Sequence, residues 1–169
     1  MTPQVAATDA SATAPAAADA LDALDASRLA AYAEVHRQIQ DHLDRMLSLA
    51  ALVQAGGPDA AIQAEAGAIE AFFSGTARRH HADEERVLFP ALLAGGDEER
   101  ATTVSMLQQD HGWIDQNWGE LGPLLSALAQ GHHWVEPEEL RHDVEVFRDL
   151  CTGHLALEDT LIPPPTRAS

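Results

Sequence analysis

The stretch HHADEERVLFP, residues 80–90, contains one half of an internal repeat. HADEERVLFP (81–90) and HLALEDTLIP (154–163) both read His, three residues, Glu, four residues, Pro. A histidine and a glutamate four residues apart lie one turn apart on the same face of an α-helix. Each stretch therefore predicts a helix that presents an imidazole and a carboxylate to the same point.

A further histidine precedes each copy of the repeat at nearly the same distance, His36 before the first and His111 before the second. Both lie on apolar helical faces, His36 with Ile39 and His111 with Ile114. The chain thus predicts two helical hairpins that bring four histidines and two glutamates into one core. The candidate metal ligands are His36, His81, Glu85, His111, His154 and Glu158.

The register of the first copy has an alternative. His80 and Glu84 are also four residues apart. On a helical wheel at about 100° per residue, the apolar residues upstream align better with His80 than with His81. The match to the second copy and to its proline favours the pair His81 and Glu85. We take that pair as the prediction, although the wheel alone does not decide between the two.

The combination of residues favours metal binding over a charged surface. One such stretch alone is more often a solvated face, and one buried histidine is more often structural than a ligand. Buried glutamates are rare, however, and normally need a cation or a proton. Two matched copies on inward faces therefore indicate a metal, and imidazole with carboxylate ligands suits iron, manganese or zinc.

Glycine and proline divide the rest of the chain into four long segments rich in Ala and Leu, with no sustained strand pattern. Four helices with short connections predict an all-α, up-down-up-down four-helix bundle over residues 27–165. The Ala-rich residues 1–26 predict a disordered tail, and 166–169 a short C-terminal tail. Gly122-Pro123 predicts a kink or a break in the third helix.

Composition excludes several classes of function. The formal net charge is −17 over 169 residues, which argues against binding to nucleic acid or anionic membranes. The single cysteine, Cys151, excludes an internal disulfide framework and Cys-rich metal sites. No apolar run approaches the ~18 residues of a membrane helix. The N-terminus lacks the basic start of a secretion signal, so we expect a cytoplasmic protein.

The motifs VHRQI around His36, HHADEERVLFP, QQDHGWI around His111 and GHLALEDTLIP resemble the hemerythrin family in its bacterial HHE cation-binding branch. The resemblance covers residues from about 29 to 165. It implies a four-helix bundle around two non-haem irons, with Glu85 and Glu158 as the bridging carboxylates. It also implies a small diatomic partner, O2 or NO, and leaves any protein partner unknown.

The chain departs from the oxygen-carrying members of that family at two positions. They place a further histidine where this chain has Asp115, which could be an additional ligand, a partner of a ligand or a solvated acid. They place the last carboxylate at the position of Asp159, whereas the wheel puts Glu158 on the side of His154. Reversible binding, sensing, iron storage, a di-iron enzyme and a metal-stabilised interaction module all stay open.

Overall fold

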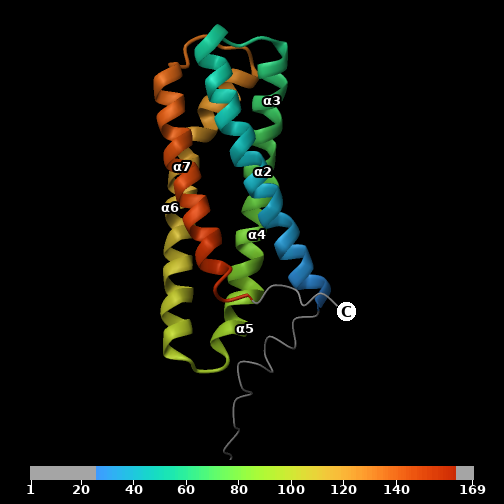
Figure 1. The fold of residues 1–169 in the computed structure, drawn as a ribbon, viewed down its shortest axis with the longest axis vertical. Helices are drawn as coiled ribbons and strands as arrows, with labels where there is room; N and C mark the ends of the chain where they lie inside the picture. The colour runs from blue at the N-terminus through green and yellow to red at the C-terminus, as the bar shows by residue number, and fades with distance from the viewer. Residues whose placement is uncertain (1–25, 163–169) are drawn as a thin grey trace, which may run out of the picture.

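Helix α2 (Ala26–Gly56) begins the part of the chain that the computed structural model describes, residues 26–162. The helices there form a four-helix bundle, which confirms the predicted fold class (Figure 1). We call each of the four lengths of the bundle a rod, and α2 is the first. The second rod consists of consecutive α and π segments, namely α3 (Ala60–Ala71), η1 (Phe72–Ala77), α4 (Arg78–Asp83), η2 (Glu84–Leu88) and α5 (Phe89–Leu93). The third and fourth rods are the single helices α6 (Glu98–Ala129) and α7 (Pro137–Glu158).

The connections between the rods contain the residues that end and begin helices. Asp59 and Asp97 are N-caps, and each side chain accepts hydrogen bonds from two backbone N–H groups of the first turn. Gly57, Gly96 and Gly131 have φ values of 76°, 68° and 77°, a backbone conformation that side chains disfavour. The predicted tails, 1–26 and 166–169, fall outside the described residues apart from Ala26, so these boundaries stay predictions.

Pro123 does not interrupt the third rod, because α6 continues as a helix on both sides of it. The expected break at Gly122-Pro123 is therefore absent. Proline removes one intrahelical hydrogen bond. Leu121 and Leu125, on either side of it, are buried in the core, and their packing stabilises the helix through this point.

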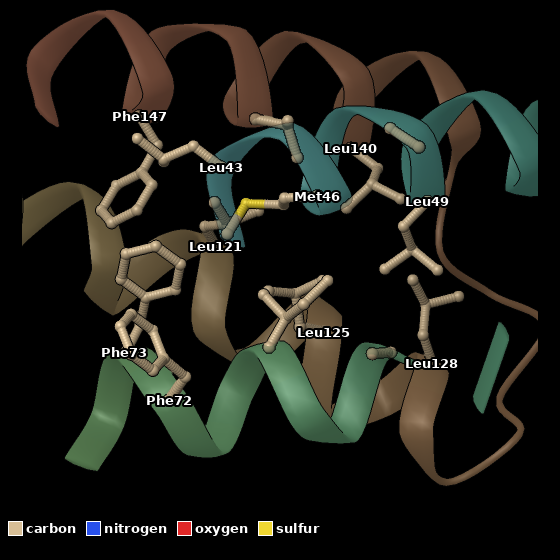
Figure 2. Close-up of a cluster of buried hydrophobic side chains, with 14 of the residues drawn as sticks. Leu43, Met46, Leu49, Phe72, Phe73, Leu121, Leu125, Leu128, Leu140 and Phe147 are labelled. Atoms are coloured by element: carbon tan, nitrogen blue, oxygen red, sulfur yellow. The ribbon is translucent and has the colours of Figure 1, made fainter. Parts of the chain in front are cut away.

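The apolar core consists of two clusters. The larger cluster fills the half of the bundle shown in Figure 2, where Phe73, Leu125 and Phe147 extend toward one another from different rods. The smaller cluster lies near α5 and includes Tyr32 and Leu107. Within residues 26–162, no helix is both long and apolar enough to span a lipid bilayer.

Candidate metal site

A polar layer separates the two apolar clusters. On α2, His36 lies between Tyr32 of the smaller cluster and Ile39 of the larger one. On α6, His111 lies between Leu107 and Ile114 in the same way. The layer is therefore closed by apolar packing above and below. An ionisable group in it loses most of its contact with water.

Two groups of side chains in this layer have the spacing of metal ligands, with candidate ligand atoms within 4.8 Å of one another. The three-histidine group consists of His81, Glu84, His111 and His154. The two-histidine group consists of His36, His80, Glu84 and Glu158. All four rods of the bundle contribute to the layer, and Glu84 belongs to both groups.

The two oxygens of Glu84 face different groups. Its Oε1 is 2.6 Å from Nε2 of His80, and its Oε2 is 3.3 Å from Nε2 of His111. Glu158 reaches across the layer with one oxygen, because its Oε2 is 3.2 Å from Nε2 of His36 and 3.5 Å from Nε2 of His154. Both carboxylates are almost fully buried, with side-chain exposures of 0% and 1%. This is an arrangement in which two carboxylates can bridge two cations.

Several buried atoms of the layer approach one another closely but make no well-aligned hydrogen bond to any described residue. They are Nε2 of His36 and His80, Nδ1 of His154, and both carboxylate oxygens of Glu84 and of Glu158. Leaving such atoms unpaired is costly, and bound cations are one of the few ways to satisfy carboxylates and imidazoles together. The donor set, imidazole nitrogen and carboxylate oxygen, fits iron, manganese or zinc. The residues present therefore fit a dinuclear metal centre.

The electrostatics of the layer follow from burial and from the two carboxylates. Burial opposes protonation of His36, but the Glu158 and Glu84 carboxylates outweigh it and raise its pKa to about 9. Burial, together with the positive charge of a neighbouring histidine, lowers the pKa of His81 and of His154 to about 3. Because a metal binds the neutral imidazole, its binding displaces a proton from His36 and meets His81 and His154 already neutral.

The inward carboxylate of the second rod is Glu84, whereas the prediction placed Glu85 inward. The side chain of Glu85 is 48% exposed, and Glu85 belongs to neither group. The two π segments that flank α4 explain the difference. Their i→i+5 turns change the angle between successive residues, so the register of α7, a continuous α-helix, does not carry over to this rod residue for residue. As a result, His80 faces the two-histidine group and His81 the three-histidine group.

The structure brings the other predicted residues together. His36, His81, His111, His154 and Glu158 all lie in the layer, although their role as ligands stays a prediction. Sequence analysis left His80 and Glu84 as the alternative pair, and the structure adds both. The signal that pointed to them was the apolar face they share with the residues upstream in the same rod.

Glu85 has a place behind the three-histidine group. The Nδ1–H of His111 donates to Oε1 of Glu85 at 2.9 Å, which leaves Nε2 of His111 facing the layer. Asp110 is farther from Nδ1 of His154, at 3.8 Å, and Asp159 is 3.9 Å from Nδ1 of His36. Carboxylates that accept from the outer nitrogen of a histidine hold the ring in orientation for a metal.

Replacing Glu85 with alanine is expected to weaken metal affinity by about tenfold. This is the lower end of the range for side chains that hold a metal-binding histidine in place, and we expect it because half of the Glu85 side chain is exposed. The metal content after growth in ample iron should stay near that of the wild type. Competition with a chelator measures the effect. Glu85→Gln, which keeps an acceptor for His111, should recover most of the loss, and Glu120→Ala, at an exposed acid on α6, serves as the control. Equal release from Glu85→Ala and wild type would count against this role.

Asp115 and Cys151 lie beside the layer rather than in it. Asp115 is exposed and belongs to neither group of candidate ligands among the described residues. Cys151 is buried, and burial raises the pKa of its thiol to about 12, so the thiol is protonated at neutral pH. Neither side chain offers a ligand atom to the two groups as they stand.

Comparison with known proteins agrees with this geometry. One relative, an uncharacterized protein of Haemophilus influenzae (strain ATCC 51907 / DSM 11121 / KW20 / Rd), is 29% identical over 94 residues, which cover 55% of this chain and 52% of that protein. The chain thus spans about half the length of this curated relative. No solved structure gives a significant match. Residues 10–164 match the model of the hemerythrin HHE cation-binding domain. The chain therefore belongs to the hemerythrin family, and its two buried His/Glu groups are candidates for a metal site within the matched domain.

Proposed function

We propose that this protein holds two iron ions in the polar layer, one in each group, and that it binds a small uncharged diatomic molecule there, O2 or NO. The carboxylates of Glu84 and Glu158 would bridge the two ions. The imidazoles of the three-histidine group would hold one ion, and those of His36 and His80 the other.

The observation that carries the proposal is the position of Glu84. One of its oxygens faces each group, the side chain is fully buried, and its close contacts with histidine nitrogens lack the alignment of hydrogen bonds. A carboxylate in this position is expensive without cations on both sides. Helical bundles that carry paired carboxylates and histidines on facing helices are typical carriers of dinuclear iron.

The residues of the chain define what such a centre can do. Iron held by these residues would supply a coordination position for a diatomic molecule. The apolar clusters above and below the layer exclude water from it, and Glu85 orients His111. With metal bound, the histidines of the layer would be neutral ligands, and the buried thiol of Cys151, whose pKa is raised to about 12, is a weak acid, so these side chains offer no ready proton to a bound molecule. Binding or sensing is therefore the function that the site supports best.

The first test is the metal content of the purified protein after expression with ample iron. We expect about two irons per chain, the count of a dinuclear carboxylate bundle. Addition of O2 or NO to the reduced protein should then change its visible absorption spectrum. His80→Ala should lower the iron content, and His132→Ala, which changes an exposed loop histidine, should not. A single zinc per chain, or an iron-loaded protein whose spectrum responds to neither gas, would reject the proposal.

A further inference from the structure

A groove lies between α2 and the second rod, on the outer side of the two-histidine group. It has about 260 Å³ of space that water-sized molecules can enter. Its deepest residues are Tyr32 and Val35 of α2 and His80 of α4. The rings of Tyr32 and His80 are buried, with centroids 5.6 Å apart. Of the candidate metal ligands, His80 lines this groove and the others do not, so the groove reaches the outer side of one histidine of the layer.

The second rod gives the groove a positive charge that no acid neutralises. Arg79 is exposed, and it forms no ion pair with an acid among residues 26–162. Its guanidinium donates to the hydroxyl oxygen of Thr76 at 3.3 Å, and it lies over Gly75, where a Cβ atom would be 3.5 Å from it. Arg79 and Thr76 both line the groove. The guanidinium has further N–H groups and the hydroxyl keeps its own proton, so the two side chains offer several donors to one anionic group.

The single acid that lines the groove, Asp83, is already occupied. It accepts from the hydroxyl of Tyr32 at 2.8 Å, from Arg28 at 3.4 Å and from Arg86. The hydrogen bond from Tyr32 and the two arginines hold the pKa of this carboxyl below its usual range. The lining of the groove thus has two arginines and one acid, in a chain whose formal net charge is −17. This local excess of positive charge favours an anion over a cation in the groove.

The two arginines of the groove are spaced along it. Arg28 of α2 contacts Asp83, which follows Arg79 by four residues in the second rod. Four residues correspond to about 6 Å along a helix axis. The outer oxygens of a four-carbon dicarboxylate such as succinate span a similar length. The groove therefore presents two cationic points at a distance that suits an anion with a charge at each end.

We propose that this groove binds a small dicarboxylate, with one carboxylate held by Arg79 and Thr76 and the other by Arg28. The carbon chain would lie against Tyr32 and Val35. Guanidinium groups hold carboxylates with two parallel N–H donors, and an inorganic anion with a single centre does not reach both arginines in that way. This inference goes beyond the proposed function, because the binding itself needs no metal.

A molecule in the groove would also cover His80 from the outside. It would thereby slow the release of a metal from the two-histidine group. This consequence rests on the proposed function, whereas the binding of the dicarboxylate does not.

Calorimetric titration of succinate into the purified full chain, at physiological ionic strength, tests the binding. We expect a dissociation constant on the order of 1 mM or lower, because both carboxylates form charge-assisted hydrogen bonds. Arg79→Ala should weaken binding by about tenfold or more. The matched control is Arg78→Ala, which removes the same charge from the adjacent exposed residue but does not line the groove. This control should bind succinate as the wild type does.

A third variant blocks the groove without changing its charge. Ala31 lines the groove and is exposed, so Ala31→Trp should abolish binding while circular dichroism stays that of the wild type. Equal weakening in Arg78→Ala and Arg79→Ala would show that succinate responds to overall charge, and it would overturn the inference. Binding of sulfate as tight as that of succinate would overturn the assignment to a dicarboxylate.

The second readout is the rate at which a strong chelator removes iron from the loaded protein. Saturating succinate should slow this release several-fold in the wild type and in Arg78→Ala, and it should have no effect in Arg79→Ala. An unchanged rate with succinate bound would overturn the covering of His80. A protein that binds succinate but contains no iron rejects the proposed function and supports the groove as a dicarboxylate site. A protein that holds two irons but does not bind succinate rejects this inference and leaves the proposed function standing.

Discussion

Glu84→Ala should reduce the iron content of the protein from about two ions per chain to a small fraction of that value, the largest loss of any single substitution in the layer. Glu84 is the residue common to both groups, with one oxygen toward His80 and the other toward His111. Removing it takes a ligand from both positions and leaves the histidines of both groups without a shared anion. Elemental analysis of the protein purified from iron-rich medium measures the loss.

The matched control is the adjacent substitution Glu85→Ala. It removes the same charge from the same turn, but from a side chain that is half exposed and outside both groups. Its iron content under the same growth conditions should stay close to that of the wild type. If Glu85→Ala loses the iron and Glu84→Ala keeps it, the bridging carboxylate is the one that the repeat pattern predicted, and the layer must rearrange around metal.

The fold could be predicted from sequence because its signals are local. Glycines with positive φ, such as Gly57 and Gly131, and aspartate caps such as Asp59 lie where one rod ends or the next begins, and the segments between them have the length and apolar content of bundle helices. Of the kink or break predicted at Gly122-Pro123, the break is absent and the kink stays a prediction, since a helix that continues past a proline can still bend there. In the bundle, buried neighbours on both sides keep that helix continuous.

The inward-facing residues of the site could be matched between the two repeats only where both helices are regular α-helices. On α7, His154 and Glu158 lie on the inward face at the expected spacing. The second rod contains π turns on both sides of its histidines, and these have no sequence signature as plain as a glycine or a proline. Matching it to α7 therefore selected Glu85 in place of Glu84. The apolar face formed by Ile62 and Ile69 in the same rod was the better guide, because packing is what sets its rotation.

The buried His/Glu layer contains polar atoms without well-aligned hydrogen bonds, and this lowers the stability of the metal-free protein. Its five histidines and two glutamates are shielded by apolar clusters on both sides, and seven of their nitrogen and oxygen atoms are unpartnered and buried. The protein without metal must keep these groups in place through partial protonation, for which the raised pKa of His36 is the clearest sign. Metal binding should therefore offset the free-energy cost of burying this layer.

Removal of the metal should accordingly have a large effect on the stability of the protein. Dialysis against a strong chelator should lower the free energy of unfolding by roughly 4 kcal/mol, the value for a ligand present at about a thousand times its dissociation constant. Thermal or urea unfolding with and without added iron measures the difference.

Glu158→Gln separates this effect from a general loss of packing. Burial and the nearby Glu84 charge raise the pKa of Glu158 against the opposing contact with His36, so the metal-free layer stabilises the charge of this carboxylate poorly. A neutral amide of the same shape should therefore cost the metal-free protein little. The same variant should lose most of the stabilisation that iron gives, because an amide is a poor bridge between two cations. An equal loss of stability with and without metal would mean that Glu158 serves the packing of α7 and not the metal. A loss confined to the metal-loaded protein would tie the burial of this carboxylate to the ion it faces.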